Sequence, residues 1–138
     1  MKKLYDEGKK AFGFYCGKGE WFLLTLKNID FMSQMLPNVS KASQSLDVSV
    51  LHTLILEKIF GIDKENMAKQ INLTYTKFFT EAIDGVDKGE FQCSFVLNPT
   101  RVTEIRDVAA AGEKMPQKST YFYPKMITGM VMNNLGVD

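Results

Sequence analysis

The sequence is poor in the side chains from which metal sites and catalytic centres are usually built. Its 138 residues include two cysteines, Cys16 and Cys93, and one histidine, His52. A structural zinc site normally takes four Cys or His ligands, so we expect no metal site within a single chain. Two widely separated thiols without a secretion signal indicate a reducing, cytoplasmic location.

Excess charge and long apolar runs are absent as well. The chain has 17 Lys and Arg against 16 Asp and Glu, a net charge of +1, which gives no global electrostatic reason for binding nucleic acid or an acidic membrane. No stretch is long and apolar enough to span a bilayer. We therefore expect neither a nucleic-acid nor a membrane partner. The N-terminal lysines are interpreted as part of a solvated, flexible segment over residues 1–10: Lys2, Lys3, Lys9 and Lys10.

Apolar alternation predicts a β-hairpin near the N-terminus. Residues 11–16 and 20–27 both have a strand pattern, and Gly17-Lys18-Gly19 between them suits a tight turn. Both faces of the second strand are largely apolar, so we expect each face to be covered. Further strands are expected over residues 71–76, 91–97 and 126–135, with residues 120–123 pairing with the last.

Helical periodicity is strongest between Asp47, the expected N-cap, and Ile59, and Gly61 follows. The other helices are expected at residues 29–36, 63–70, 78–88 and 101–111. Asp63 is expected to cap the second of these, and Thr100 or Asn98 the last. The apolar stripes predict these inward-facing residues: Phe79, Ile83, Val86, Val102, Ile105, Val108 and Ala109.

These elements predict one α+β domain over residues 1–138. The strand, helix and strand between residues 71 and 97 suggest a crossover unit, which is right-handed if its strands are parallel neighbours. The expected architecture is a mixed, mostly antiparallel sheet of five or six strands with helices packed on it.

The segment between the last two prolines contains the most polar chemistry. It reads Met115-Pro116-Gln117-Lys118-Ser119-Thr120-Tyr121-Phe122-Tyr123-Pro124, followed by Lys125. Its ammonium and hydroxyl groups suit an anion, and the start of the helix near Arg101 offers free N–H groups at a strand end. We hypothesise that the two segments meet and bind a phosphate or carboxylate. The candidate ligand residues are Lys118, Ser119, Thr120, Lys125, Thr100 and Arg101, with His52, Glu57, Asn98, Tyr121 and Tyr123 in support.

Each of these assignments has a plainer alternative. Ser119 and Thr120 can fix the entry to a strand while the lysines are solvated, and His52 can be a core-edge histidine bonded to a backbone carbonyl. Ser119 has no histidine near it in sequence, and no pair of acids suits general acid–base work. No self-sufficient catalytic centre is therefore evident, and enzymatic activity stays open.

Four segments together resemble one family. They are Ala11-Phe12-Gly13-Phe14-Tyr15 with Trp21-Phe22-Leu23-Leu24; Leu46-Asp47-Val48-Ser49-Val50-Leu51-His52 with Leu56-Glu57 and Gly61-Ile62; Phe95-Val96-Leu97-Asn98-Pro99-Thr100; and Ala110-Ala111-Gly112-Glu113 running into residues 115–125. In this order they are similar to the C-terminal portion of domain-of-unknown-function family 1015 of bacteria and archaea. Longer members have an N-terminal Asp-Gly-His-His-Arg motif that resembles partition proteins and sulfiredoxins, and this sequence has no such motif.

The resemblance implies one of two functions. The first is a non-catalytic domain that completes or regulates a ligand site on an N-terminal part, or that mediates assembly with that part or as a homo-oligomer. The second is part of a phosphate- or nucleotide-handling enzyme of small-molecule metabolism, with serine metabolism suggested by gene neighbourhoods in the family. The ligand and any cofactor stay open.

Overall fold

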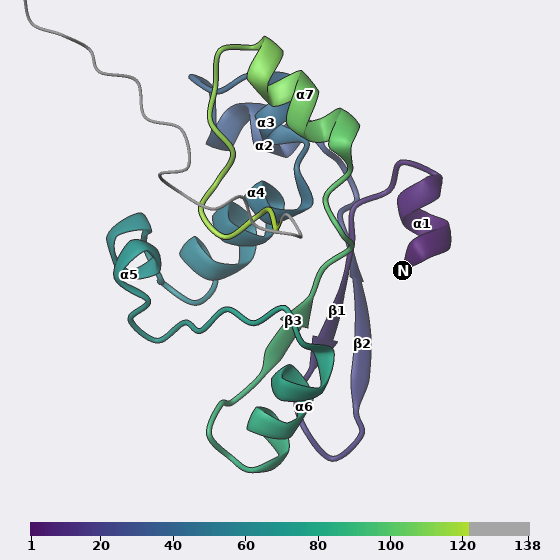
Figure 1. Cartoon of the computed structure of the whole chain (residues 1–138), viewed down its shortest axis with the longest axis vertical. Coiled ribbons are helices and arrows are strands. Elements are labelled where there is room, and N and C mark those ends of the chain that lie inside the picture. The colour runs from purple at the N-terminus through teal and green to yellow at the C-terminus, as the bar shows by residue number, and fades with distance from the viewer. Residues whose placement is uncertain (122–138) are drawn as a thin grey trace, which may run out of the picture.

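The predicted N-terminal hairpin forms the centre of the fold (Figure 1). In the computed structural model, which describes residues 1–121, β1 (Ala11–Tyr15) pairs antiparallel with β2 (Trp21–Thr25). The other edge of β1 pairs antiparallel with β3 (Ser94–Val96), so the strand order is β2-β1-β3. The turn places Gly17 and Gly19 at φ values of +95° and +76°, which glycine adopts without steric cost.

Helices lie beside the sheet and beyond one end of it, while α6 crosses near its other end (Figure 1). The helical elements are α1 (Lys2–Asp6), α2 (Asp30–Met35), α3 (Lys41–Gln44), α4 (Asp47–Val50), the π-helix η1 (Leu51–Glu57), α5 (Lys64–Lys69), α6 (Phe79–Asp87) and α7 (Val102–Ala110). All five predicted helices are confirmed, whereas α1 and α3 were not predicted. None of the helices formed by residues 1–121 has the length and apolar character of a membrane span.

The main core joins one face of the sheet to α4 and η1, which follow each other without a break. Phe12 of β1 is buried against Val50, Leu51 and Leu56 at the end of α4 and along η1. Met32 of α2 and Met67 of α5 close this cluster from either side. Burying an apolar side chain of this size contributes about 1.5–3 kcal/mol. The helical stripe that begins at Asp47 therefore has the core role that its periodicity predicts.

A smaller core fixes α7. Val108 is fully buried against Leu46 and Val48, and Met115 packs on the same cluster. The predicted stripe is correct for Val108 and wrong for Val102, which is 78% exposed at the first turn of α7. Ala109 is exposed as well. Val108 is therefore the one buried residue of α7.

The strand predicted over residues 71–76 does not form. Gln70 and Asn72 have left-handed φ values of +55° and +58°, which break an extended chain. The second edge of β1 pairs with β3, through Gly13 with Val96 and Phe14 with Phe95, and residues 71–76 pair with no strand. No crossover unit therefore exists between residues 71 and 97, and residues 71–78 form an irregular connection.

Residues 1–121 form three strands, where four of the five or six expected strands were predicted. The α+β class is correct, and all strand pairs in this part of the chain are antiparallel. The strand predicted over residues 126–135 lies outside the described residues, as do residues 122 and 123 of its expected partner. Thr120 and Tyr121, which are described, are not in a strand.

The predicted helix caps are correct only at α5. Asp63 accepts a hydrogen bond from the backbone N–H of Asn66 at 2.8 Å, as expected of an N-cap. At α4 the N-cap is Leu46, and Asp47 is the first helical residue because its carboxylate binds the ammonium group of Lys10 instead. At α7 the N-cap is Arg101, whose backbone N–H donates to Glu104 at 2.8 Å.

The N-terminal segment is more structured than its lysines suggest. Tyr5 of α1 is buried, and the side chain of Lys10 is only 14% exposed. Lys2, Lys3 and Lys9 are exposed, as expected of solvated lysines. Interpreting Lys10 as solvated was wrong, because its ammonium group is paired with buried Asp47.

The expectation that both faces of the second strand are covered was wrong: four of the five residues of β2 are exposed, and α6 covers the hairpin only near its turn. Val86 of α6 is buried and lies closest to the position that a side chain at Gly17 would take. Phe79, predicted to face inward, is 57% exposed. Its ring stacks on Trp21 of β2 at 5.7 Å between centroids, so it covers the sheet at its margin.

Candidate ligand-binding cleft

A cleft of about 570 Å³ lies between η1, α5 and the chain that follows α7. His52 and Glu57 line it from η1, and Met67 lines it from α5. Pro116 and Gln117 line it from the proline-flanked segment. The segment that the sequence singled out therefore forms one wall of a hollow, opposite the only histidine of the chain.

His52 and Glu57 share the cleft because the helix that carries them is wound as a π-helix. In a π-helix each backbone N–H bonds to the carbonyl five residues earlier, whereas in an α-helix it bonds to the carbonyl four residues earlier. The N–H of Phe60 donates to the carbonyl of Ile55, five residues earlier, at 3.0 Å. This winding brings residues 52 and 57 nearer to one face than an α-helix would. Such π segments occur frequently at functional sites.

The polar centre of the cleft is the pair formed by His52 and Tyr75. Nε2 of His52 lies 3.4 Å from the Tyr75 hydroxyl, and the two rings meet edge-on. Burial lowers the pKa of His52 and raises the pKa of Tyr75, so both side chains are uncharged at neutral pH. Each then offers a hydrogen-bond donor and an acceptor. Because 3.4 Å is long for such a bond, the two groups are weakly paired, and a ligand atom beside them can bind both.

Glu113 holds the opposite wall in place. One carboxylate oxygen accepts from the backbone N–H of Ser40 at 2.7 Å, and the other accepts from the hydroxyls of Ser40 and Ser43. These hydrogen bonds lower the pKa of Glu113. The Ser43 hydroxyl has the largest effect, followed by the N–H and the hydroxyl of Ser40. The carboxylate is therefore ionised and immobilised, and it ties the start of the proline-flanked segment to α3.

The predicted meeting of the two anion-site segments occurs, though not through free side chains. The Thr100 hydroxyl donates to the backbone carbonyl of Ser119 at 2.8 Å. The Ser119 hydroxyl in turn donates to the carbonyl of Pro116 at 2.6 Å, within its own turn. Lys118 is exposed at the tip of that turn with φ +58°, and Thr120 is half-buried.

The other candidate residues divide between structural contacts and residues outside the described chain. The guanidinium of Arg101 lies over the ring of Tyr5 at 4.1 Å and pairs with Asp6 at 2.5 Å. The Tyr121 hydroxyl accepts a hydrogen bond from Lys77 at 2.8 Å. Lys125 and Tyr123 lie outside residues 1–121.

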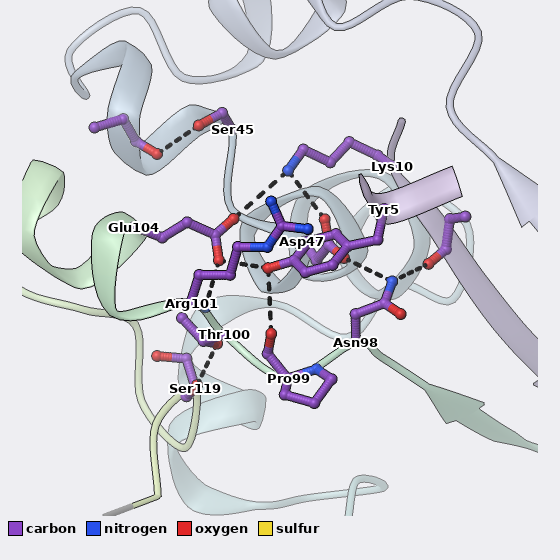
Figure 2. Close-up of polar contacts among 12 residues, drawn as sticks. Tyr5, Lys10, Ser45, Asp47, Asn98, Pro99, Thr100, Arg101, Glu104 and Ser119 are labelled. Carbon is purple, nitrogen blue, oxygen red and sulfur yellow. Dashed lines mark hydrogen bonds and ion pairs between the residues drawn. The ribbon is translucent and has the colours of Figure 1, made fainter. Parts of the chain in front are cut away.

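Asn98 belongs to a polar cluster that joins α1, α4 and α7 (Figure 2). Its amide donates to Asp47 at 3.4 Å, and Asp47 pairs with the Lys10 ammonium group at 3.1 Å. Lys10 also lies 3.8 Å from Glu104, which accepts from the Tyr5 hydroxyl at 2.7 Å. We call these five residues the Lys10 cluster. None of them lines the cleft, and of the candidate residues within residues 1–121 only His52 and Glu57 do.

In the described part of the chain, the cleft contains neither a catalytic triad around His52 nor a metal-binding cluster. Within residues 1–121 the only side chain bonded to His52 is that of Tyr75, so no carboxylate orients the imidazole toward a nucleophile. The same residues contain no cluster of His, Cys, Asp and Glu arranged to hold a metal ion. Cys16 and Cys93 are free thiols, and neither lines the cleft.

Sequence reasoning missed Tyr75 and Glu113. Tyr75 was placed in the strand expected over residues 71–76, which does not form, and the signal against that strand was Asn72, a residue type that tolerates left-handed backbone. Glu113 follows the helix-ending Gly112 and had no local signal. Its partners Ser40 and Ser43 lie 73 and 70 residues away.

Comparison of the chain with protein-family models, curated proteins and solved structures finds no match.

Proposed function

We propose that this chain is a non-catalytic ligand-binding domain whose cleft holds a small organic molecule. The observation that carries the proposal is the combination of volume and lining. Ligand sites typically enclose about 300–1,000 Å³ and combine apolar walls with a few polar groups. The cleft has about 570 Å³, apolar side chains such as Leu36 and Met67, and the uncharged His52 and Tyr75.

The arrangement of the walls supports a regulatory role. A ligand in the cleft would contact η1 on one side and residues 113–117 on the other. Binding would therefore stabilise the docked position of the segment that leads to the C-terminus. We extend the resemblance to family 1015 into the same proposal: the domain completes or regulates a ligand site on an N-terminal part of a longer protein.

A second function has one observation in its favour. Lys64 and Lys114 line the cleft, and Lys118 is exposed on the turn that follows. Ammonium groups at a cleft attract phosphate, so the domain would handle a phosphorylated small molecule or a nucleotide. Glu57 and Glu113 line the same cleft and oppose this preference, so we rank the uncharged polar ligand first.

Thermal-shift screening of the chain separates the two functions. A ligand that binds only the folded state raises the Tm in proportion to the logarithm of its excess over Kd. We expect uncharged polar heterocycles to raise the Tm in a dose-dependent way. Stabilisation restricted to inorganic phosphate, phosphoserine and nucleotides would select the second function, and no stabilisation by any compound would contradict both.

A matched pair of substitutions assigns the site. Ala68 lines the cleft from α5, whereas Ala109 is an exposed alanine on α7 away from it. Ala68→Trp should fill the cleft and abolish the ligand-induced shift, while Ala109→Trp should leave it unchanged. An equal ligand-induced rise in Tm in both variants would show that the ligand binds outside the cleft.

A further inference from the structure

The outer edge of β2 is an open row of backbone hydrogen-bonding groups. The N–H of Leu26 donates to Lys10 at 3.0 Å and that of Cys16 to Glu20 at 3.5 Å, which fixes the alternation of the hairpin. Trp21, Leu23 and Thr25 therefore direct their N–H and C=O groups away from β1. No strand of residues 1–121 lies beyond them, and Figure 1 shows β2 at the margin of the sheet.

This edge lacks three features by which proteins block edge pairing: a proline, a charged residue and a bulge. Between Trp21 and Leu26 there is no proline and no charged residue, and the register with β1 is continuous, without a bulge. The side chains are apolar and exposed on both faces, with Trp21 at 44%, Phe22 at 51% and Leu23 at 51%. An exposed, apolar edge without such features can pair with another strand.

We propose that β2 pairs antiparallel, about a two-fold axis at Leu23, with β2 of a second copy of this chain. This register pairs all five strand residues: Leu23 faces itself, Trp21 faces Thr25, and Phe22 faces Leu24. Aromatic and β-branched or aliphatic cross-strand pairs of this type are favourable. The resulting sheet is continuous through both copies, in the order β3-β1-β2-β2-β1-β3.

The charges at the two ends of β2 favour this partner. Glu20 precedes the strand and Lys27 follows it. An antiparallel two-fold brings the Glu20 end of one copy to the Lys27 end of the other, so opposite charges meet at both ends of the contact. A parallel arrangement would place like charges together. The contact is a single strand pair, so we expect a weak dimer with Kd of about 10 µM to 1 mM.

Sedimentation velocity of the full chain over a range of concentrations tests the proposal. We expect the wild type to show a reversible monomer–dimer equilibrium, and Leu23→Lys and Leu23→Glu each to be monomeric because like charges would face each other at the axis. An equimolar mixture of the two variants should regain association, because residue 23 then faces an opposite charge. Val102→Lys, which charges a 78% exposed position on α7, should dimerise like the wild type.

Thr25→Pro provides an independent variant. It removes an edge N–H that β1 does not use, so the fold should persist by circular dichroism while the dimer is lost. A monomeric wild type up to about 1 mM, a dimer that survives Leu23→Lys, or a mixture that stays monomeric would overturn the proposal. Loss of the dimer on removal of residues 122–138, with the edge variants still associating, would assign the contact to that segment instead and overturn it as well.

Discussion

The ammonium group of Lys10 lies 3.1 Å from Oδ1 of Asp47, and these side chains are only 14% and 8% exposed. The two charges in a pair this deeply buried depend on each other, because removal of one partner would leave the other as an unpaired buried charge. The pair joins the chain just before β1 to the first turn of α4 (Figure 2). It explains why Asp47, which looks like a helix cap in the sequence, has a different role.

We predict that Lys10→Met lowers the free energy of unfolding by about 3–5 kcal/mol, because it leaves the Asp47 carboxylate buried without its partner. The double variant Lys10→Met, Asp47→Leu should lose less than Lys10→Met alone. Urea denaturation of the single and double variants measures both values. A double variant at least as unstable as the single one would show that the two charges are not coupled.

Stability should also depend on His52. Burial lowers its pKa below the ordinary 6.5, so the unfolded chain binds a proton that the folded chain does not. The contribution of His52 is fully present above pH 6.5 and is lost as the pH falls toward the lowered pKa. We expect His52→Gln to weaken this acid-side loss. Urea unfolding of both proteins on either side of pH 6.5 checks it, and parallel pH profiles would contradict it.

Glu113 should produce a separate transition at lower pH. Its hydrogen bonds hold the pKa below the ordinary 4.5, so its contribution is present above pH 4.5 and is lost as the pH falls through the lowered value. Glu113→Gln should be less stable at neutral pH and should vary less in stability below pH 4.5. Ser43→Ala, which removes one of the three donors, serves as the partial variant and should fall between wild type and Glu113→Gln.

The two valines of α7 should differ sharply. Val108→Ala opens a cavity in the smaller core and should cost about 2 kcal/mol. Val102→Ala changes a side chain that is 78% exposed and should be within about 0.5 kcal/mol of wild type. Thermal or urea unfolding of this pair on one helix measures how far the core extends along α7. Equal costs would contradict the assignment of Val108 to the core.

The elements that could be predicted from the sequence are those with a local cause. Gly17 and Gly19 mark the hairpin turn within the chain itself, and the stripe after Asp47 marks a buried helix by its spacing. Which strands pair with each other in the sheet has no comparable local signal in the sequence. The alternation from Ile71 to Tyr75 suits a strand, yet this segment pairs with no strand, and β3 is the partner of β1.

The cleft was foreseen only in part, for the same reason. The proline-flanked segment and His52 were singled out by composition, and both contribute to it. The partner of His52, Tyr75, lies 23 residues away, and the partners of Glu113 are far more distant. The π winding that turns Glu57 toward the cleft has no distinct side-chain pattern. The contacts of Tyr75 and Glu113 join residues far apart in the sequence, so no local pattern could predict them.

The hydrogen bond from the Ser40 backbone N–H to Glu113 has a practical consequence. That amide proton is shielded from exchange with solvent only while residues 113–117 stay docked. Its exchange rate, followed residue by residue in heavy water, therefore reports how often the cleft wall opens. The chain thus contains its own probe of wall opening, at a backbone position that no label needs to disturb.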